Sequence, residues 1–320
     1  MTTGPGSRPV RTVFLGSGEF GVDSLLELGS HPDVELVGVV TAPPRRAGRK
    51  GVLTHTPILE HVLHWQAAPT ILTPEHLRSA GAVATVMALH PELLVLADYG
   101  QIVPEALLHL KHGALNLHPS LLPRHRGATP IPAAILAGDT ETGVTLMKMD
   151  AGLDTGPILA QKHLSLDGRE TAPLLEDDLE LLASQVLYRH LGPWLRGEIV
   201  PVVQDEVLAT LTRPLRREDG RLDPTRAAMD LERQVRAYAP WPGSFVETPL
   251  FGRLIVEEAA LAASESGDSP GRLVADGMGL ALTASDGRLR LGRVRVAGRK
   301  PMTAADLRRG APGLVDSAVR

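Results

Sequence analysis

The chain has 320 residues, of which 43% are hydrophobic and 22% charged, with a formal net charge of −4, 3% aromatic residues and no cysteine. These values are those of an ordinary globular protein long enough for two domains, and the missing cysteines exclude disulfides and thiolate metal sites. The amino terminus lacks the apolar run of a signal peptide, and no stretch is long enough to span a membrane, so we expect a cytoplasmic protein.

The first half of the chain alternates short apolar runs with helical patterns. The runs cover residues 11–16, 34–40, 93–97, 113–118 and 143–149. Near-continuous apolar strands separated by helices are typical of a parallel sheet covered on both faces. We therefore predict an α/β fold whose amino-terminal domain is a Rossmann-like, mostly parallel sheet. Such sheets bind ligands at the carboxyl ends of their strands, which lie here just after residues 16, 40, 97, 118 and 149.

The pattern changes after a helix predicted near residues 171–191. Residues 192–212 contain Gly and Pro without clear periodicity and are predicted to be a linker. Beyond them, short alternating runs separated by Gly and Asp turns indicate a smaller β-barrel or sandwich, OB-like in size. The predicted domains are therefore 1–191 and 213–320.

One predicted strand of the second domain carries an arginine at every second residue on each side of Gly292. The window 286–300 holds five Arg and one Lys against one Asp. We predict a bulge at Gly292, because the apolar alternation changes parity there. A bulge would let all four strand arginines face outward, namely Arg288, Arg290, Arg293 and Arg295. They either bind an anionic partner or only protect a solvated strand edge from pairing.

Residues 113–158 contain the most informative polar side chains. Asn116 and His118 are two apart in a predicted strand, so they point to the same side of it. Asp150 and Asp154 follow the next predicted strand, in a Gly-rich turn. An amide donor, an imidazole and a carboxylate at neighbouring strand ends would suit acyl transfer. Each residue type also has a purely structural use in turns and at strand ends, so the residues alone leave both interpretations open.

Two motifs resemble those of a known family. NLHPSLLPRHRGATPI, beginning at Asn116, and MDAGLDTGPIL, beginning at Met149, resemble the two signatures of the folate-dependent formyltransferases. The resemblance implies that Asn116, His118 and Asp154 are catalytic, with Asp150 as a less critical acid. It also implies that a loop contacts the folate, formed by Ser120, Leu121, Leu122 and Pro123.

The resemblance extends over nearly the whole chain and is greatest to members that act on initiator tRNA. Residues 41–51 resemble a basic loop that meets the tRNA acceptor end, which implies tRNA contacts by Arg45, Arg46, Arg49 and Lys50. Residues 97–104 resemble the lining of the folate pocket, which implies contacts by Tyr99, Gly100, Gln101 and Ile102. Residues 236–245 and 297–310 resemble parts of the carboxyl-terminal domain.

The resemblance implies a reaction as well as a site. The formyl group of 10-formyltetrahydrofolate would pass to the α-amino group of methionine carried on initiator tRNA, without a metal. Asn116 and His118 would stabilise the oxyanion that forms, while Asp154 positions His118 and helps to move the proton. The arginine strand would contact tRNA phosphates.

The sequence departs from the family pattern at three places. Asp98 stands where a small residue is usual, residues 54–58 lack an expected lysine, and His125 replaces an aromatic residue between two arginines. None of these changes falls on the three residues implied to be catalytic.

Other interpretations remain to be weighed. Residues 16–21 fit G-x-G-x-x-G, the turn of nicotinamide oxidoreductases, although the second strand does not end in the acidic residue that usually accompanies it. A formyltransferase that acts on a sugar nucleotide would share the Asn-His-Asp site but has less use for the basic loop at 45–50. A non-catalytic RNA-binding barrel would leave that site unexplained and offers few aromatic residues for stacking. His118 and His125, seven apart in a loop, do not match a metal motif.

Overall fold

The computed structural model describes residues 8–47 and 51–319. Its internal contacts divide the chain into two units, each of which is considered by itself. The first unit comprises Met1–Pro130, Glu141–Ser165 and Glu176–Thr212, and the second comprises Ile131–Thr140, Leu166–Leu175 and Arg213–Arg320. In the part of the chain that the structure describes, no helix is both long and apolar enough to cross a membrane.

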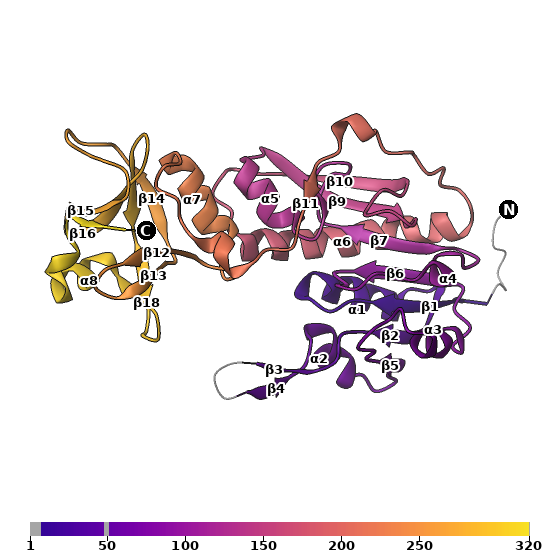
Figure 1. Ribbon diagram of the computed structural model, residues 1–320. Coiled ribbons are helices and arrows are strands. Elements are labelled where there is room, and N and C mark those ends of the chain that lie inside the picture. Colours follow the sequence, from indigo (N-terminus) through magenta and orange to yellow (C-terminus); the bar gives the residue numbers. More distant parts are fainter. Residues whose placement is uncertain (1–7, 48–50, 320) are drawn as a thin grey trace. The chain divides into compact units, whose positions relative to one another are not determined.

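The first unit is built on a seven-stranded sheet (Figure 1). In spatial order its strands are β10 (Ile158–Ser165), β9 (Glu141–Lys148), β7 (Ala114–His118), β6 (Leu93–Ala97), β1 (Val10–Leu15), β2 (Val34–Val40) and β5 (Thr70–Leu72). The strands from β7 to β5 run parallel, which confirms the predicted mostly parallel sheet. The central strand β6 is buried along its whole length, as its uninterrupted apolar sequence predicts.

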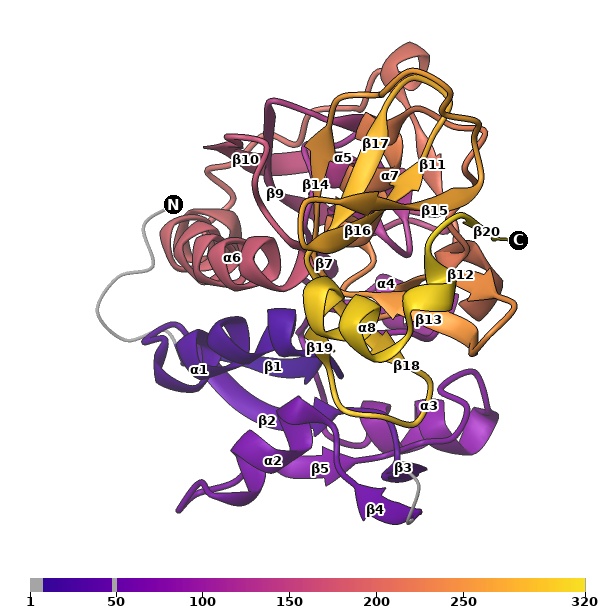
Figure 2. The ribbon, with the colours of Figure 1, turned by 90° about the vertical axis from the view of Figure 1, so that its left-hand side faces the viewer.

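Helices cover both faces of this sheet. The chain's longest helix, α6 (Ala172–Leu195), lies beside α1 (Val22–Ser30), where the Asp23 backbone N–H donates to the Glu180 carboxylate at 3.0 Å (Figure 2). The other face packs against α3 (Ala80–Met87) and α4 (Glu105–Leu108) through a shared apolar cluster. Helices thus cover both faces, so a polar side chain buried on the sheet needs a partner.

Two further helices belong to this part of the chain. α2 (Pro57–Leu63) contacts α1 and is capped by the preceding Thr56, whose hydroxyl accepts from the Leu59 backbone N–H. α5 (Pro130–Ala137) begins at the boundary between the two units.

The direction of β9 differs from the expectation. β9 runs antiparallel to β7, with Leu115 opposite Lys148 and His118 opposite Thr145. The carboxyl end of β9 therefore lies at the edge of the sheet where β7 begins. The prediction that the turn after β9 sits at the same strand-end edge as His118 is wrong, because the two strands end at opposite edges.

Residues 196–212, within the stretch predicted to be a linker, are built into the first unit and are called the strap below. Residues 192–195 are still part of α6. Val202 and Ile158 exchange two backbone hydrogen bonds of 2.7 and 2.8 Å. Further along, β11 (Leu211–Thr212) pairs in parallel with β8 (Arg126–Gly127). The strap thus follows the edge of the unit as an ordered segment.

The second unit contains two antiparallel sheets around one apolar core, which confirms the predicted small β-barrel or sandwich. One sheet has the order β12 (Ser244–Thr248), β13 (Gly252–Val256), β18 (Arg293–Val296) and β19 (Met302–Thr303). The other has the order β14 (Ala259–Ala262), β17 (Arg288–Leu291), β16 (Gly279–Thr283), β15 (Arg272–Asp276) and β20 (Ser317–Ala318). Besides residues 131–137 of α5, this unit contains the helices α7 (Ala228–Ala237) and α8 (Ala304–Gly310), and Figure 2 shows α8 beside β16.

The arginine strand is two strands that meet at a corner. β17 belongs to the five-stranded sheet and β18 to the four-stranded one, so Gly292 joins two sheets rather than forming a bulge within one ladder. A side chain at Gly292 would lie 3.3 Å from Glu258, which leaves little room for any other residue at the corner. The change of parity predicted from the sequence is nevertheless present, since the apolar residues of both strands are buried.

Candidate active site

Strand β7 directs two polar side chains onto one face of the sheet. Asn116 pairs with Leu96 of β6, and Leu96 belongs to the apolar cluster under α3 and α4. Residues paired across neighbouring strands share a face, so Asn116 and, two residues later, His118 point to this side. Asn116 is also the only asparagine among the 320 residues. An amide and an imidazole are thus placed where the neighbouring strand carries only apolar residues.

Asp154 reaches these two residues from the turn between β9 and β10. The turn is ordered by Asp150, whose carboxylate accepts from the Gly152 backbone N–H at 2.9 Å and the Thr155 hydroxyl at 2.7 Å. Asp154 itself has a left-handed backbone with φ of 53°. The turn therefore folds back over the sheet, which brings Asp154 to the middle of β7 although β9 ends at the far edge.

The three side chains predicted to be catalytic lie together. The Asp154 Oδ2 atom is 3.7 Å from His118 Nδ1, and its Oδ1 atom is 3.5 Å from the Asn116 amide nitrogen. Oδ2 also accepts a 2.8 Å hydrogen bond from the Gly127 backbone N–H. The carboxylate is therefore fixed at one oxygen by the backbone, and it faces both the amide and the imidazole.

The imidazole of His118 is held by its other nitrogen. Nε2 lies 2.9 Å from the backbone carbonyl oxygen of His125. Because a carbonyl oxygen only accepts, Nε2 carries the proton in the neutral ring and Nδ1 presents its lone pair towards Asp154. Burial lowers the pKa of His118, while Asp154 and the His125 carbonyl act in the opposite direction without reversing the shift. The ring is thus neutral near pH 7, with a basic nitrogen in the site.

The loop that follows β7 is tightly bonded within the first unit. The Ser120 hydroxyl donates to the Arg124 carbonyl oxygen at 2.6 Å, and the Leu122 backbone N–H donates to the Thr145 hydroxyl at 3.1 Å. The side chains of Ser120 and Leu122 are buried, whereas Leu121 and Pro123 are half-buried. Of the four residues predicted to bind folate here, Ser120 and Leu122 stabilise the loop itself.

The second predicted folate segment follows β6. Gln101 accepts from the Leu77 backbone N–H at 2.8 Å and donates to the Pro74 carbonyl oxygen at 3.2 Å, so its amide orders a neighbouring loop. Gly100 is exposed, and 69% of the Ile102 side chain is open to solvent. The Tyr99 hydroxyl is buried without a hydrogen-bond partner among the described residues. Desolvation of this hydroxyl raises the pKa of Tyr99 to about 12.

The glycines of residues 16–21 serve to pack the turn after β1 against the end of β6. A side chain at Gly16 would meet the Phe14 ring and the Ala97 carbonyl oxygen, and one at Gly18 would meet the Asp98 carboxylate. The close approach to the Ala97 backbone explains the glycine at position 16 without a dinucleotide, whereas the Asp98 side chain beside Gly18 could move aside.

The predicted basic loop is a short hairpin of β3 (Arg45–Ala47) and β4 (Val52–Thr54). Arg45 and Arg46 are exposed, and the Arg46 guanidinium donates to the Gly51 carbonyl oxygen at 2.9 Å. The other two predicted tRNA contacts, Arg49 and Lys50, lie outside the described residues.

The four arginines of β17 and β18 differ in exposure. Arg288 is 5% exposed, and its guanidinium forms two 2.7 Å hydrogen bonds with Asp268 and an ion pair with Glu265. The expectation that Arg288 faces outward is therefore wrong, because a carboxylate from the 264–271 loop holds it inside. The remaining arginines are at least partly open to solvent.

Each of these three arginines has an acidic neighbour. Arg290 pairs with Asp276, while Arg293 and Arg295 share Glu257. A local surplus of positive charge consequently remains only on β18, where two arginines face one carboxylate.

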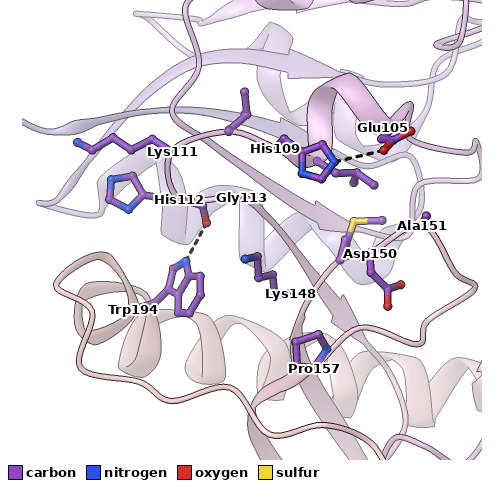
Figure 3. A pocket seen from close by; sticks show the side chains of 13 residues that line it. Glu105, His109, Lys111, His112, Gly113, Lys148, Asp150, Ala151, Pro157 and Trp194 are labelled. Atoms are coloured by element: carbon purple, nitrogen blue, oxygen red, sulfur yellow. Dashed lines mark hydrogen bonds and ion pairs between the residues drawn. The ribbon is translucent and has the colours of Figure 1, made fainter.

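A pocket of about 590 Å³ lies at the opposite edge of the sheet, where β7 begins and β9 ends (Figure 3). Trp194 closes one side of it and donates from its indole N–H to the His112 carbonyl oxygen at 3.0 Å. Lys148 and Asp150 line it as well, but none of the three predicted catalytic residues does. The pocket is therefore separate from the Asn-His-Asp cluster.

The sequence interpretation missed two groups that complete the cluster. The first is the backbone carbonyl of His125, which selects the tautomer of His118. The second is Gln204 of the strap, whose amide contacts the turn that carries Asp154. No motif marks either group, since one is a main-chain atom and the other lies in a segment without periodicity. Among the described residues, no group of three His, Asp or Glu side chains is arranged to hold a metal ion.

Comparison with known proteins shows which family the chain resembles. The formyl transferase family model matches residues 10–191, and the model for the formyl transferase carboxyl-terminal domain matches residues 214–312. The methionyl-tRNA formyltransferase of Roseiflexus sp. (strain RS-1) is 42% identical over 305 residues, which cover 94% of this chain and 93% of that protein. The methionyl-tRNA formyltransferase of Myxococcus xanthus (strain DK1622) is 42% identical over 315 residues, covering 96% and 97%.

A solved structure shares the fold at much lower identity. The N-formyltransferase from Helicobacter canadensis, in complex with folinic acid and dTDP-3-aminofucose, aligns with a TM-score of 0.63 and 15% identity over 88% of this chain and 98% of that one. The relatives at 42% identity are methionyl-tRNA formyltransferases, so a sugar-nucleotide acceptor is not favoured. With both family matches and near-complete coverage by these relatives, the resemblance read from the sequence is confirmed, and the chain belongs to the formyltransferase family.

Proposed function

We propose that this enzyme transfers the formyl group of 10-formyltetrahydrofolate to the α-amino group of methionine esterified to initiator tRNA, in the cytoplasm. The observation that carries the proposal is the meeting of Asn116, His118 and Asp154 on one face of β7. The names of the relatives at 42% identity over nearly the full chain support methionyl-tRNA as the acceptor.

The reaction needs a base and an oxyanion donor. The amine nitrogen attacks the formyl carbon, the bond between that carbon and the folate N10 breaks, and one proton passes from the amine to N10. The α-amino group of an esterified amino acid is less basic than a lysine side chain, so a useful fraction is uncharged at neutral pH. Attack by this neutral amine produces a tetrahedral oxyanion, whose charge the site has to stabilise.

His118 is suited to carry the proton. Its Nε2–H is bonded to the His125 carbonyl oxygen, which leaves the Nδ1 lone pair to accept a proton from the attacking amine and return it to N10. The Asp154 carboxylate at 3.7 Å stabilises the imidazolium that forms in between. The Gly127 N–H keeps that carboxylate in place.

Asn116 is suited to stabilise the oxyanion. Its amide nitrogen lies 3.5 Å from Asp154, a long contact that leaves a second N–H free to donate to the substrate. One well-placed donor of this kind is worth about 3 kcal/mol in the transition state. The amide thus contributes roughly two to three decades of the rate.

The folate contacts are proposed for the half-buried or exposed members of the two loops near the cluster, namely Leu121, Pro123, Tyr99, Gly100 and Ile102. Ser120, Leu122 and Gln101 hold the loops in shape. This assignment is supported by the position of the first loop directly after His118, since the formyl carbon must lie within reach of the imidazole.

The tRNA contacts are proposed for Arg45, Arg46, Arg49 and Lys50, together with Arg290, Arg293 and Arg295 of the second unit. Arg45 and Arg46 are exposed, and β18 keeps a surplus of positive charge. Arginine side chains in such positions bind phosphate and release counterions, so the affinity would fall as salt rises.

An acceptor comparison tests the proposal. The purified enzyme is incubated with 10-formyltetrahydrofolate and one of four acceptors: methionyl initiator tRNA, free methionine, glycinamide ribotide or an aminosugar nucleotide. Formylation of the charged tRNA at a kcat/KM at least a hundredfold above the other three supports it. Comparable or faster formylation of a small amine would overturn the proposed acceptor while leaving the family assignment intact.

A further inference from the structure

The strap binds both halves of the active site. On one side the Thr210 hydroxyl accepts from the His125 backbone N–H at 2.7 Å, next to the carbonyl that anchors the His118 ring. On the other side, the Val202 backbone is paired with Ile158, just after the turn that carries Asp154. The strap is therefore one continuous segment that connects the loop holding the His118 imidazole with the turn carrying the Asp154 carboxylate.

Gln204 is the strap residue that contacts the Asp154 turn directly. Its Nε2 donates to the carbonyl oxygens of Asp154 at 2.8 Å and Gly156 at 2.7 Å. Its Oε1 accepts from Arg126 Nε at 3.0 Å. The side chain is 5% exposed, and both its N–H bonds and its oxygen have partners inside the protein. A buried amide that is satisfied in this way has one orientation only.

Arg126 extends this contact to the loop after β7. Its guanidinium is buried and forms two hydrogen bonds with Glu206 of the strap, at 2.9 and 2.7 Å. Its carbonyl oxygen accepts from the Thr212 hydroxyl at 3.0 Å. The residue that follows, Gly127, donates its N–H to Asp154 Oδ2. Gly127 thus fixes the carboxylate of Asp154 from one side. Gln204 fixes the main chain of Asp154 from the other side.

The backbone of Asp154 needs such support. Its φ of 53° lies in the left-handed region, which Asp tolerates better than most residues with a side chain but which is still sparsely populated, so the surrounding hydrogen bonds help to hold it. Without the Gln204 donors, the turn could relax and move the carboxylate away from His118.

We infer that Gln204 is a positioning residue for formyl transfer, acting through the main chain of Asp154 and Gly156. It does not touch the imidazole or the reacting groups, so its effect should appear in kcat and not in substrate binding. The inference rests on the catalytic role proposed for Asp154.

Gln204→Glu is the decisive variant. A carboxylate keeps the acceptor for Arg126 but removes both N–H donors, so the strap stays bonded while the Asp154 turn is released. We expect kcat for the formylation of methionyl-tRNA to fall by about 10- to 100-fold, the range expected for a misplacement of roughly 1 Å. Both KM values should stay within about twofold of wild type. Gln204→Asn, which keeps the amide but shortens its reach, decides the matter if the Glu variant does not fold.

The second unit supplies a matched control. Gln234 is also buried, donates to two backbone carbonyl oxygens, those of Asp219 and Arg221, and accepts from an arginine, Arg226. Gln234→Glu removes the same two donors, but from a turn that carries no proposed catalytic group. It should lower the melting temperature without reducing kcat. An equal loss of kcat in both variants would mean a general effect on stability and would overturn the inference.

A double mutant separates this inference from the proposed mechanism. If Gln204 acts only through Asp154, the variant Gln204→Glu/Asp154→Ala has the same kcat as Asp154→Ala alone. Independent, multiplying losses would reject the positioning role, as would a near wild-type kcat for Gln204→Glu. By contrast, full activity of Asp154→Ala itself would reject the catalytic assignment on which the inference rests.

Discussion

The carboxylate of Asp154 faces Nδ1 of His118 at 3.7 Å, while Nε2 of the same ring is bonded to a backbone carbonyl. The two nitrogens of His118 therefore have different tasks, one anchoring the ring and the other available to a substrate proton. Carboxylate and imidazole meet although their strands end at opposite edges of the sheet, because the turn after β9 folds back. The catalytic predictions depend on this geometry.

Removal of the amide of Asn116 should stop the chemistry but not the folding. We expect Asn116→Ala to lower kcat roughly 10²- to 10³-fold, the usual loss for one oxyanion donor. Since Asn116 is the only asparagine in the chain, ¹⁵N-asparagine labelling gives one pair of side-chain amide signals. These signals should shift when a formylfolate binds. A kcat near wild type, or signals that ignore the ligand, would reject the assignment.

The pH profile of kcat should reflect the buried imidazole. Burial lowers the pKa of His118 below its ordinary value of about 6.5, so the basic form dominates at neutral pH and is lost only as the pH falls below that value. The acid limb of kcat should therefore have its midpoint below pH ~6.5. Asp154 raises the pKa of His118, so Asp154→Asn should move the midpoint lower still. A midpoint that moves upward in this variant would contradict the geometry.

Charge reversal in the β3–β4 hairpin should weaken tRNA binding selectively. Arg45→Glu/Arg46→Glu should raise the KM for methionyl-tRNA about tenfold or more at physiological salt. It should also flatten the salt dependence of that KM, because fewer counterions are released. The KM for 10-formyltetrahydrofolate should stay unchanged. Parallel changes in both KM values would argue against a tRNA contact here.

Arg288 and Arg293 should respond differently to the same substitution. Arg288→Met removes the guanidinium that ties Asp268 and Glu265 to β17, so the protein should unfold at a lower temperature and a lower urea concentration. Arg293 is exposed and shares Glu257 with Arg295, so Arg293→Met should change stability by less than about 1 kcal/mol. Only the Arg293 variant should raise the KM for tRNA at unchanged fold.

The Tyr99 hydroxyl tests the folate loop. It is buried without a partner among the described residues, so Tyr99→Phe should leave the stability unchanged or raise it slightly. If the hydroxyl is retained for the folate, the KM for 10-formyltetrahydrofolate should rise several-fold while the KM for tRNA does not change. An unaltered folate KM would remove Tyr99 from the proposed site.

The sequence predicted the sheet well where burial determines the pattern. β2 and β6 have the predicted bounds, because a strand covered on both faces is a short, uninterrupted apolar run. The direction of β9 could not be read in this way, since an apolar run looks the same in a parallel and an antiparallel strand. Asn116 and His118 were predicted to share a side because strand geometry alone requires it.

Side chains whose role depends on distant partners were not predictable. Arg288 is buried because its guanidinium bonds to Asp268, which lies twenty residues earlier in the chain. Nothing in the alternation of β17 distinguishes Arg288 from Arg290. The sequence predicted a linker where the strap lies. Polar contacts hold the strap in place, and such contacts produce no apolar periodicity in the sequence. Gln204, with 5% exposure, is as buried as a core residue although no pattern marks it.

The strap also determines where the first unit can be cut. A fragment that stopped at the end of α6 would retain every strand of the large sheet and its covering helices. It would, however, expose the carbonyl oxygens of Asp154 and Gly156 and the guanidinium of Arg126, all of which the strap satisfies. Dissection or fusion of the enzyme should therefore keep the chain intact through Thr212, because the bonds between the strap and the loop after β7 end there and not at α6.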